Sequence, residues 1–548
     1  MNPIKGALKI CFVLCLAFVG IATISSDHGK YFEISKNIEI FTNLYKEINT
    51  YYVDDVDPAK LMRTGVDAML ESLDPYTNYI SESEIEGFRY ITDGKYNGIG
   101  AMIRTIDSKV TVTEPYDGCP AQKAGLKAGD EILSIDGKST KNKSTDDVSN
   151  ILKGFPGTEV VLKVKRPGTE QPLKITLTRD EVLVPNVPYS GMLNEEVGYI
   201  SLITFTRNAG KNVGDALKKL KEENPKLKGI IFDLRGNGGG LLTEAVNVSN
   251  VFIPKGEMVV TTKGKVVDWD RSFKTINKVV EKDLPLILLI DGNSASASEI
   301  VSGVIQDLDR GVLVGQQSYG KGLVQNTRDV GYNSKVKLTT AKYYIPSGRC
   351  IQGVSYEDGE PVDIPDEERT VFKTRNGRSV LDGGGVRPDV IINEDTDAQL
   401  VRSLQERYII FNYVTEYCLK HPQTPDISTF KFEDYDDFVR FVAKEGLVFN
   451  TKSEQELDEF EAQAKREGLE SVVTDQVKNL KQAMEDQKKR DLMRYKDVIV
   501  DLIEKEVISR YHFQKGKIQV GLRNDKEIKE AISLLQDGER YRTVLNQK

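Results

Sequence analysis

The spacing of hydrophobic positions along the chain changes twice, and each change predicts a different kind of structure. In residues 31–72 apolar side chains recur every three or four positions, which predicts two helices. Asp57-Pro58 marks the start of the second helix, because a capping residue precedes a proline at the first turn. From about residue 96 short strand-like runs alternate with Asp-Gly turns, and this pattern predicts a β-rich region with one helix over 146–153.

A third region begins near residue 182. The runs 229–234 and 286–290 are continuously apolar, as expected of strands that are buried on both faces. Each run is followed by a loop and then by a helical stripe, an alternation that predicts an α/β core with crossover connections. Sites in such sheets lie in the loops that follow the strands. Beyond about residue 393 the chain is charged and helical, which is typical of an accessory helical domain.

The N-terminus carries an export pattern. Lys5 and Lys9 precede a nearly unbroken apolar run over 10–24, which predicts a signal peptide or an uncleaved signal anchor. The chain is then predicted to divide into a signal or anchor (1–26), a helical segment (30–92), a β-rich region (93–181), an α/β core (182–395) and a helical accessory domain (396–548).

Composition narrows the functional classes. The chain has 548 residues, 39% hydrophobic and 29% charged, with a net charge of -8, which suits a globular protein with substantial cores. It shows no basic stripe with interleaved aromatic residues, so nucleic acid is not an expected partner. The cysteines outside the apolar N-terminal run are Cys119, Cys350 and Cys418. Their number and spacing predict neither a disulfide framework nor a metal site, and no cofactor is expected.

Candidate chemistry lies in two short segments, Asn293–Glu299 (NSASASE) and Tyr319–Gln325 (YGKGLVQ). Serines at the start of an apolar helix could include an exposed nucleophile. The chain has only three histidines, all far from these serines in sequence, which disfavours a Ser-His-Asp triad. Lys321, between two glycines, is the alternative base, since a lysine can deprotonate a serine. Each segment by itself is typical of a helix entry or a solvated turn.

The glycine loop Asp233–Gly240 (DLRGNGGG) lacks the Gly-Lys-Ser/Thr ending of a phosphate-binding loop and the spacing of a dinucleotide fingerprint. A glycine loop between a buried strand and a helix can aim several backbone N–H groups at one point. That arrangement is what an oxyanion hole requires. The residues alone leave the nucleophile open among Ser294, Ser296 and Ser298.

From residue 52 to about residue 392 the chain resembles one family, the C-terminal processing peptidases or tail-specific proteases. The resemblance is carried by motifs in the family's order: SLDPY at 72–76, a PDZ segment, the glycine loop, both candidate segments, AKYYIPSGRCIQ at 341–352 and GGGVRPD at 383–389. It implies a multidomain α/β protein with a crotonase-like serine peptidase core (182–395), an inserted PDZ domain (93–181), an N-terminal helical segment and a C-terminal helical domain. It also implies a serine peptidase with a Ser-Lys dyad.

The resemblance assigns roles to individual residues. It places the nucleophile at Ser296, the general base at Lys321 and a lysine-orienting glutamine at Gln325. Oxyanion donors would be the N–H groups of Ala297 and of a loop glycine, Gly239. Asp307 matches an acidic position of some members, with a structural charge as the equal alternative. A lysine with an ordinary pKa of about 10.4 must be desolvated before it can act as a base near neutral pH.

The PDZ segment suggests how substrates are chosen. Gly98-Ile99-Gly100-Ala101 resembles a carboxylate-binding loop, whose N–H groups would hold the C-terminus of a peptide. The expected partners are proteins with accessible apolar C-terminal tails, together with either an adaptor lipoprotein or a second copy bound through the C-terminal helices. The expected location is the bacterial periplasm, free or anchored to the inner membrane. The alternatives are a catalytically inert PDZ scaffold and a crotonase-fold acyl-CoA enzyme.

Overall fold

A computed structural model describes residues 30–85, 87, 92–357, 360–363, 365–392, 399–445 and 452–547. The predicted signal segment, 1–26, lies outside the described residues. Within the described part of the chain, no helix combines the length and the apolar character that crossing a membrane requires. By its contacts the chain forms two compact units, Met1–Tyr79 and Ile80–Lys548.

The described part of the first unit contains the two predicted helices. One spans 30–51, and the second, α2, spans Pro58–Glu71. Asp57 caps α2 by accepting the N–H groups of Ala59 and Lys60, as the Asp-Pro signal predicts. The Tyr45 hydroxyl donates to the Pro58 carbonyl at 2.7 Å and so ties the first helix to the start of the second.

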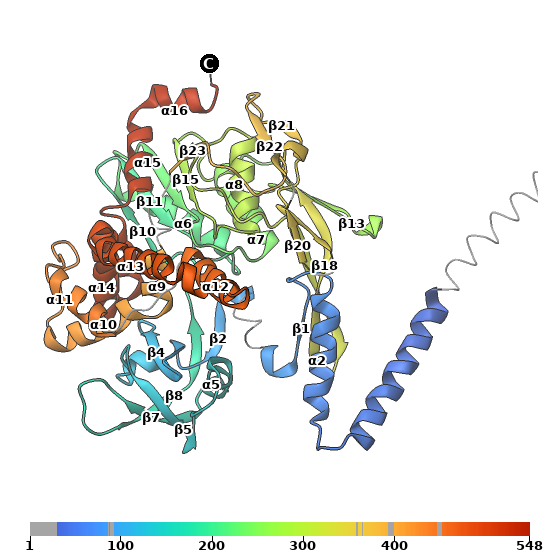
Figure 1. The fold of residues 1–548 in the computed structure, drawn as a ribbon. Coiled ribbons are helices and arrows are strands. Elements are labelled where there is room, and N and C mark those ends of the chain that lie inside the picture. The colour runs from blue at the N-terminus through green and yellow to red at the C-terminus, as the bar shows by residue number, and fades with distance from the viewer. Residues whose placement is uncertain are drawn as a thin grey trace, which may run out of the picture. The chain divides into compact units, whose positions relative to one another are not determined.

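The second unit begins with a β-rich region that contains the predicted strands and the predicted helix (Figure 1). An antiparallel sheet of order β3-β4-β5-β7-β8, with β6 beside β5, packs its apolar side chains around α4 and α5. A separate pair, β2 and β9, closes the region. The elements are β2 (Lys95–Gly98), β3 (Ala101–Ile106), β4 (Lys109–Pro115), α4 (Pro120–Lys123), β5 (Glu131–Ile135), β6 (Lys138–Ser139), α5 (Thr145–Leu152), β7 (Glu159–Lys165), β8 (Leu173–Thr178) and β9 (Asp180–Leu183).

The α/β core is a sheet of order β10-β11-β12-β15-β16-β23, in which every pair except β10-β11 is parallel. Both predicted apolar runs are central strands, and all residues of β12 and β15 are buried. The elements are β10 (Tyr189–Met192), β11 (Val197–Ser201), α6 (Ala209–Glu223), β12 (Gly229–Asp233), α7 (Leu242–Phe252), β15 (Leu286–Ile290), α8 (Ala297–Asp307), β16 (Val312–Gly315) and β23 (Val390–Ile391).

The two faces of this sheet are covered by different parts of the chain. Side chains such as Phe232 and Leu288 pack with α6, α7 and α8, while Ile231 and Leu289 on the opposite face pack with α15 (Lys526–Gln536) and α16 (Gly538–Val544). The predicted boundary at residue 395 groups α15 and α16 with the accessory helices. In the structure these two helices also cover one face of the core sheet, because the alternate residues of each strand need an apolar cover.

A second sheet stands beside the core and is built on the long hairpin β17-β18, with β13 and β14 continuing it. The hairpin turn contains Tyr332 and Asn333, both at positive φ, the geometry of a tight hairpin turn. The remaining elements outside the C-terminal region are β1 (Asn78–Ile80), η1 (Glu82–Glu84), β13 (Met258–Gly264), η2 (Val267–Trp269), β14 (Arg271–Lys274), β17 (Leu323–Gly331), β18 (Ser334–Tyr344), β19 (Val354–Glu357), β20 (Glu360–Asp363), η3 (Asp366–Glu368), β21 (Val371–Lys373) and β22 (Ser379–Leu381).

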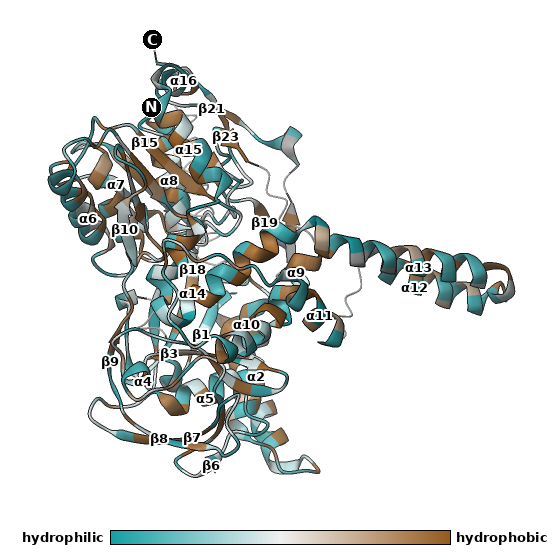
Figure 2. Ribbon diagram, turned by 90° about the vertical axis from the view of Figure 1, so that its left-hand side faces the viewer, coloured by the Kyte–Doolittle hydropathy of each residue, from teal (hydrophilic) through white to brown (hydrophobic). Residues whose placement is uncertain are grey.

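The predicted C-terminal helices are present. A cluster centred on Tyr413, which meets the rings of Phe432, Phe438 and Phe441, holds several of them together. Figure 2 shows α12 and α13 side by side as a largely hydrophilic hairpin. The elements are α9 (Gln399–Glu406), α10 (Ile409–Lys420), α11 (Tyr435–Glu445), α12 (Lys452–Arg466), α13 (Glu470–Arg494) and α14 (Lys496–Gly521).

Candidate active site

A pocket of about 420 Å³ brings together most of the residues predicted for catalysis. Ser296, Ala297, Lys321, Gln325 and Gly239 all line it. They come from the loop after β15, the loop before β17, β17 itself and the glycine loop after β12. The C-terminal ends of neighbouring parallel strands therefore supply the site, as expected for this kind of sheet.

The three candidate serines have different surroundings. Ser294 and Ser298 are fully buried, and their hydroxyls donate to the carbonyls of Leu234 (2.9 Å) and Asn237 (2.7 Å). Ser296 is half-buried and lines the pocket. It sits at the cap of α8 with φ 55° and ψ -111°, a strained conformation for a residue with a side chain. Of the three, the structure thus opens only Ser296 to the pocket.

A fully buried carboxylate, Glu299, holds the backbones on both sides of the pocket. Its Oε2 accepts the N–H groups of Ser296 (2.8 Å) and Lys321 (2.9 Å). Its Oε1 accepts the Ser318 hydroxyl (2.6 Å) and the Gly320 N–H (2.7 Å). Burial raises the pKa of Glu299 to about 7, although these four donors favour the charged form. Glu299 therefore fixes Ser296 relative to the lysine loop.

Tyr343, near the end of β18, makes the corresponding contacts on the carbonyl side. Its hydroxyl lies 3.1 Å from the carbonyl oxygen of Ser296 and 2.5 Å from that of Lys321. The ring is buried, with 1% of the residue exposed, and lines the same pocket. Glu299 and Tyr343 were not predicted as site residues. The Ser-x-x-Glu spacing of a capping box could have indicated Glu299, whereas only the folded hairpin reveals Tyr343.

The glycines around Lys321 allow the lysine loop to pack closely. A Cβ atom at Gly320, where φ is 92°, would lie 3.2 Å from the Cα of Gly353, and one at Gly322 would lie 2.7 Å from the N of Gln352. The Gly322 N–H also donates to the Gln352 side chain at 2.7 Å. Gln325 follows in β17 and donates to the Thr339 hydroxyl at 3.1 Å. The Gly-Lys-Gly segment is thus a packed loop of the site.

The two predicted oxyanion donors differ in availability. Ala297 is the first residue of α8, where an N–H has no partner within its own helix. Gly239 packs directly on it, since a Cβ at Gly239 would lie 2.9 Å from the Ala297 N. However, the Gly239 N–H donates to Asn237 Oδ1 at 2.9 Å. In this conformation the Gly239 N–H therefore does not point into the pocket. Gly238, the neighbouring glycine, also lines the pocket.

Asp307 lies away from this pocket. It ends α8, eleven residues and about 16 Å from Ser296 along the helix. Its Oδ1 accepts from Arg349 at 2.9 Å, and its Oδ2 accepts the Ser347 N–H at 2.9 Å. Both charged side chains are buried, with 2% of Arg349 and 0% of Asp307 exposed. The structure therefore gives Asp307 a structural ion pair at the opposite end of the helix.

The predicted carboxylate-binding loop joins β2 to β3. Gly98, Ile99 and Gly100 are buried, and Ala101 starts β3. The carbonyls of Ile99 and Gly100 accept the N–H groups of Ala121 (2.7 Å) and Tyr116 (2.9 Å), which directs these carbonyls into the domain. Gly100 has φ 75°. A Cβ there would lie 2.3 Å from the Cys119 Cβ, so only glycine fits.

Comparison with known proteins adds the family. The model of peptidase family S41 matches residues 196–359, the PDZ domain model matches 111–166, and a model described as "Probable PDZ-protease, C-terminal helical domain" matches 400–535. A carboxy-terminal-processing protease of Bartonella bacilliformis is 37% identical over 336 residues, which are 61% of this chain and 77% of that protein. The chain belongs to the carboxy-terminal-processing proteases of peptidase family S41.

Other members of this family match in the same way. A probable CtpA-like serine protease of Staphylococcus aureus is 35% identical over 333 residues, or 60% of this chain and 65% of that protein. Among solved structures, the photosystem II D1 C-terminal processing protease is 26% identical, covers 65% of this chain and 93% of its own, and has a TM-score of 0.36. The predicted family and multidomain α/β fold are confirmed. The predicted domain boundaries and site residues stay predictions.

Proposed function

We propose that this S41 peptidase is a serine endopeptidase in which Ser296 is the nucleophile and Lys321 the general base. One observation carries the assignment of the nucleophile. Of the three serines in the Ser-Ala-Ser-Ala-Ser segment, two have buried hydroxyls bonded to carbonyls of the glycine loop, and only Ser296 lines the pocket with Lys321. A nucleophile needs an exposed oxygen and a base from the same cavity.

The proposed reaction is acyl transfer to serine followed by hydrolysis. Neutral Lys321 removes the proton of Ser296 as its Oγ attacks the scissile carbonyl, then returns the proton to the leaving amine. Water then attacks the acyl group on Ser296 while Lys321 accepts a water proton. Lys321 passes this proton to Ser296 Oγ as the acyl–Oγ bond breaks, which releases the carboxylic acid product and restores both groups. Gln325 orients the lysine amine. Negative charge on the carbonyl oxygen is stabilised by the N–H of Ala297 and by an N–H group of the glycine loop. If this second donor is Gly239, its hydrogen bond to Asn237 Oδ1 must first break.

The pocket also suggests which bond is cut. Its walls include Leu241, Leu242, Ile300, Ile203 and Val324. An apolar wall next to the nucleophile favours an apolar side chain beside the scissile bond. We therefore expect cleavage within apolar stretches of a substrate rather than at charged positions.

Cleavage of casein or of a tagged peptide tests the nucleophile. Ser296→Ala should remove the activity, whereas Ser294→Ala and Ser298→Ala should each keep at least about a tenth of it, because they lose only one bond to the glycine loop. These two variants are matched controls, since all three changes remove one hydroxyl from the same segment. Full activity in Ser296→Ala would contradict the proposal.

The PDZ domain supports a further part of the proposal, recognition of C-terminal tails. A tail held at Gly98–Ala101 would make cleavage upstream effectively intramolecular, at a local concentration that can reach about millimolar. Amidating a substrate's C-terminus removes the charge that the loop would bind, so KM should rise strongly. If tail binding also switches the site on, kcat should fall as well. Equal cleavage of free-acid and amidated substrates would contradict both roles.

Location and partners follow from the sequence pattern rather than from the fold. We propose export to the periplasm because Lys5 and Lys9 precede the apolar run over 10–24. To test export, residues 1–30 are fused to a reporter enzyme that is active only after export. We expect the fusion to be active and a fusion that lacks the apolar run over 10–24 to be inactive. A reporter that stays inactive would contradict export. Binding of an adaptor or of a second copy through the C-terminal helices remains a prediction.

A further inference from the structure

The glycine loop of the active site is held from three directions, and one of them is unexpected. The Ser294 and Ser298 hydroxyls and the Ala295 N–H bond its carbonyls from the nucleophile segment. The Asn237 amide donates to the Leu202 carbonyl at 2.7 Å from the side of β11. Both supports belong to the peptidase core. The third support comes from α15, at the end of the chain.

This third support is a cluster of charges around Arg235, the third residue of the loop. Arg235 Nε and Nη2 donate to both oxygens of Asp233, within the loop. Its Nη1 donates to Asp525 Oδ2 at 2.7 Å and to Glu527 Oε2 at 2.6 Å, which lie 290 and 292 residues further along. Burial opposes the charge, but the three carboxylates outweigh it and hold the pKa of Arg235 well above its ordinary value. The guanidinium is therefore a permanent cation with a fixed direction.

The same C-terminal region also contacts the PDZ domain. Gly129 of the PDZ domain packs on α10, because a Cβ there would lie 2.8 Å from Thr415 Cγ2. The Thr415 hydroxyl in turn accepts from Arg510 of α14 at 3.2 Å. From Arg510, α14 continues to Gly521, and the chain reaches Asp525 within four more residues.

One residue of α14 shows that this connection is under strain. Phe513, between Arg510 and the end of α14, has φ 54° and ψ -158°, which makes a kink between two helical stretches of α14. A bulky residue adopts this conformation only where the surrounding contacts impose it. The strained position lies between the PDZ contact and the carboxylates that bind Arg235.

We propose that the C-terminal helical region positions the oxyanion-hole loop, with Asp525 and Glu527 holding Arg235 and α14 connecting this clamp to the PDZ domain. Arg235 is a positioning residue because it acts on the loop and does not line the pocket of Ser296. The loop carries both Asn237 and Gly239, so the clamp controls whether the Gly239 N–H faces Asn237 or the substrate. This inference rests on the proposed peptidase mechanism, since it concerns the donors that stabilise the oxyanion.

Asp525→Asn is the most selective test. Asn keeps the capping bonds that Asp525 Oδ1 receives from the N–H groups of Glu527 and Ile528, but loses the charge that faces Arg235. Because oxyanion donors act in the transition state, kcat for a peptide substrate should fall at least about tenfold while KM stays within about twofold. Glu530→Gln, in α15, is the matched control, since it breaks only an ion pair with Arg540 of α16 and should leave kcat unchanged.

Combining Asp525→Asn with Arg235→Gln separates a direct contact from general damage. If both act through one contact, the double variant should be no slower than the slower single variant. An unchanged kcat in Asp525→Asn, or multiplied losses in the double variant, would overturn the clamp. A wild-type chain without peptidase activity would instead overturn the proposed function, and this inference with it.

The connection to the PDZ domain has its own measurement. In the wild type, a free-acid substrate should have a higher kcat than its amidated form, and this ratio should fall toward one in Asp525→Asn because the loop no longer follows α14. The Glu530→Gln control should keep the wild-type ratio. If the kcat ratio of free-acid to amidated substrate were one in the wild type, or equal in the wild type and Asp525→Asn, the connection to the PDZ domain would be overturned. The contact between Asp525 and Arg235 would then be judged only by the kcat of Asp525→Asn.

Discussion

The two ends of α8 each carry a buried carboxylate, and the two have different partners. At the N-terminal end, Glu299 accepts four hydrogen bonds from neutral donors of the Ser296 and Lys321 loops. At the C-terminal end, Asp307 is paired with the cation Arg349. Burial raises the pKa of both carboxyl groups. The comparison shows that a shifted pKa by itself does not mark a catalytic residue, because the partners decide the role.

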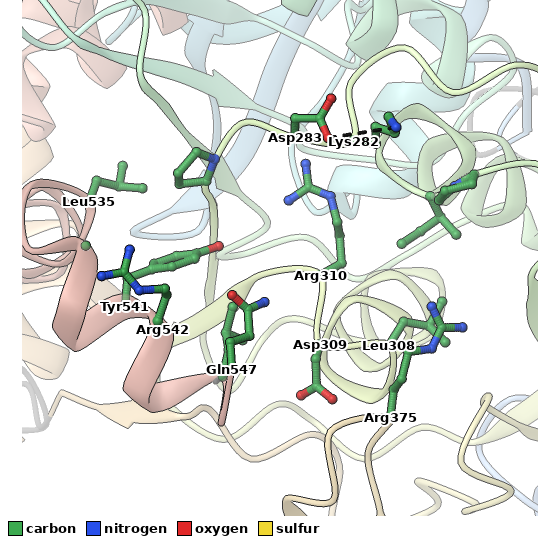
Figure 3. Close-up of a pocket in the computed structure, with 15 residues that line it drawn as sticks. Lys282, Asp283, Leu308, Asp309, Arg310, Arg375, Leu535, Tyr541, Arg542 and Gln547 are labelled. Atoms are coloured by element: carbon green, nitrogen blue, oxygen red, sulfur yellow. Dashed lines mark ion pairs between the residues drawn. The ribbon is translucent and has the colours of Figure 1, made fainter.

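Each end also borders a pocket. The N-terminal end opens on the pocket with Ser296 and Lys321. The C-terminal end borders a second pocket of about 440 Å³, in which Figure 3 shows Leu308, Asp309 and Arg310 across from Tyr541 of α16. Arg310 donates to the backbone carbonyls of Phe252 and Leu284, so it ties the end of α8 to the end of α7 and to the segment before β15. We therefore expect variants at the N-terminal end of α8 to lower activity most, and variants at the C-terminal end to lower stability most.

The largest effect on activity is expected for the proposed dyad. Lys321→Ala, like Ser296→Ala, should lower kcat/KM by more than about a thousandfold, and the double variant should be no worse, since the two groups act as one unit. The measurement is peptide cleavage by purified variants with matched circular dichroism spectra.

Histidine variants are the controls for this dyad. His421→Gln and His512→Gln should keep the wild-type kcat, because both imidazoles bond backbone carbonyls in the C-terminal helical region. A tenth of the activity surviving in Lys321→Ala, or a collapse in either histidine variant with folding intact, would require a different base.

The next largest effect is expected for Glu299→Gln. The amide NH₂ of glutamine would face N–H donors, so backbone groups of Ser296, Gly320 or Lys321 would lose their acceptor. We expect kcat to fall about a hundredfold and the free energy of unfolding to fall by about 1–3 kcal/mol. Steady-state kinetics and chemical denaturation measure the two losses separately, and wild-type kinetics in this variant would contradict the positioning role.

The same substitution predicts a pH dependence with a definite sign. The pKa of Glu299 rises from 4.5 to about 7 on folding, so the native chain binds this proton more tightly than the unfolded chain. The contribution of this group to stability is therefore complete below about pH 4.5 and is lost as pH rises through 7. Glutamine does not titrate, so the stability advantage of the wild type over Glu299→Gln should shrink between pH 5 and 8. An advantage that grows over this range would contradict the shift.

A smaller effect is expected for Tyr343→Phe. This change removes the hydroxyl between the carbonyls of Ser296 and Lys321 and leaves the buried ring in place. We expect kcat to fall about tenfold, with KM unchanged and a loss of about 1 kcal/mol in unfolding free energy. Tyr344→Phe, at the adjacent position, is the matched control. If both variants had equal kinetics, Tyr343 would have no role in positioning.

The smallest effect on activity, with the largest on stability, is expected for Asp307→Asn. It leaves Arg349 buried without its counter-charge, which typically costs about 3–5 kcal/mol. In the remaining folded protein, kcat should change less than about threefold, because Asp307 lies at the other end of α8. Denaturant titration and active-site-normalised kinetics test both halves. A large fall in kcat at unchanged stability would reverse the comparison between the two ends of the helix.

Much of the fold could be predicted from local pattern. The continuous runs over 229–234 and 286–290 are central strands because a strand with two buried faces needs apolar residues at every position. The pattern did not show what covers each face, and α15 and α16 come from the far end of the sequence. The order of motifs indicated the family, while the choice of Ser296 among three serines depended on the resemblance.

The sequence by itself determined the elements, the order of the domains and the residue types available for catalysis, because these depend on neighbours within a few positions. Tertiary structure decided which serine opens on the pocket, that Asp307 pairs with Arg349, and that the Gly239 N–H is bonded to Asn237. It also brought Glu299 and Tyr343 to the backbones of Ser296 and Lys321, and Asp525 to Arg235. The Gly239–Asn237 and Ser296–Glu299 contacts are local. The other contacts join residues tens to hundreds of positions apart and form only when the chain has closed around them, so no local pattern encodes them.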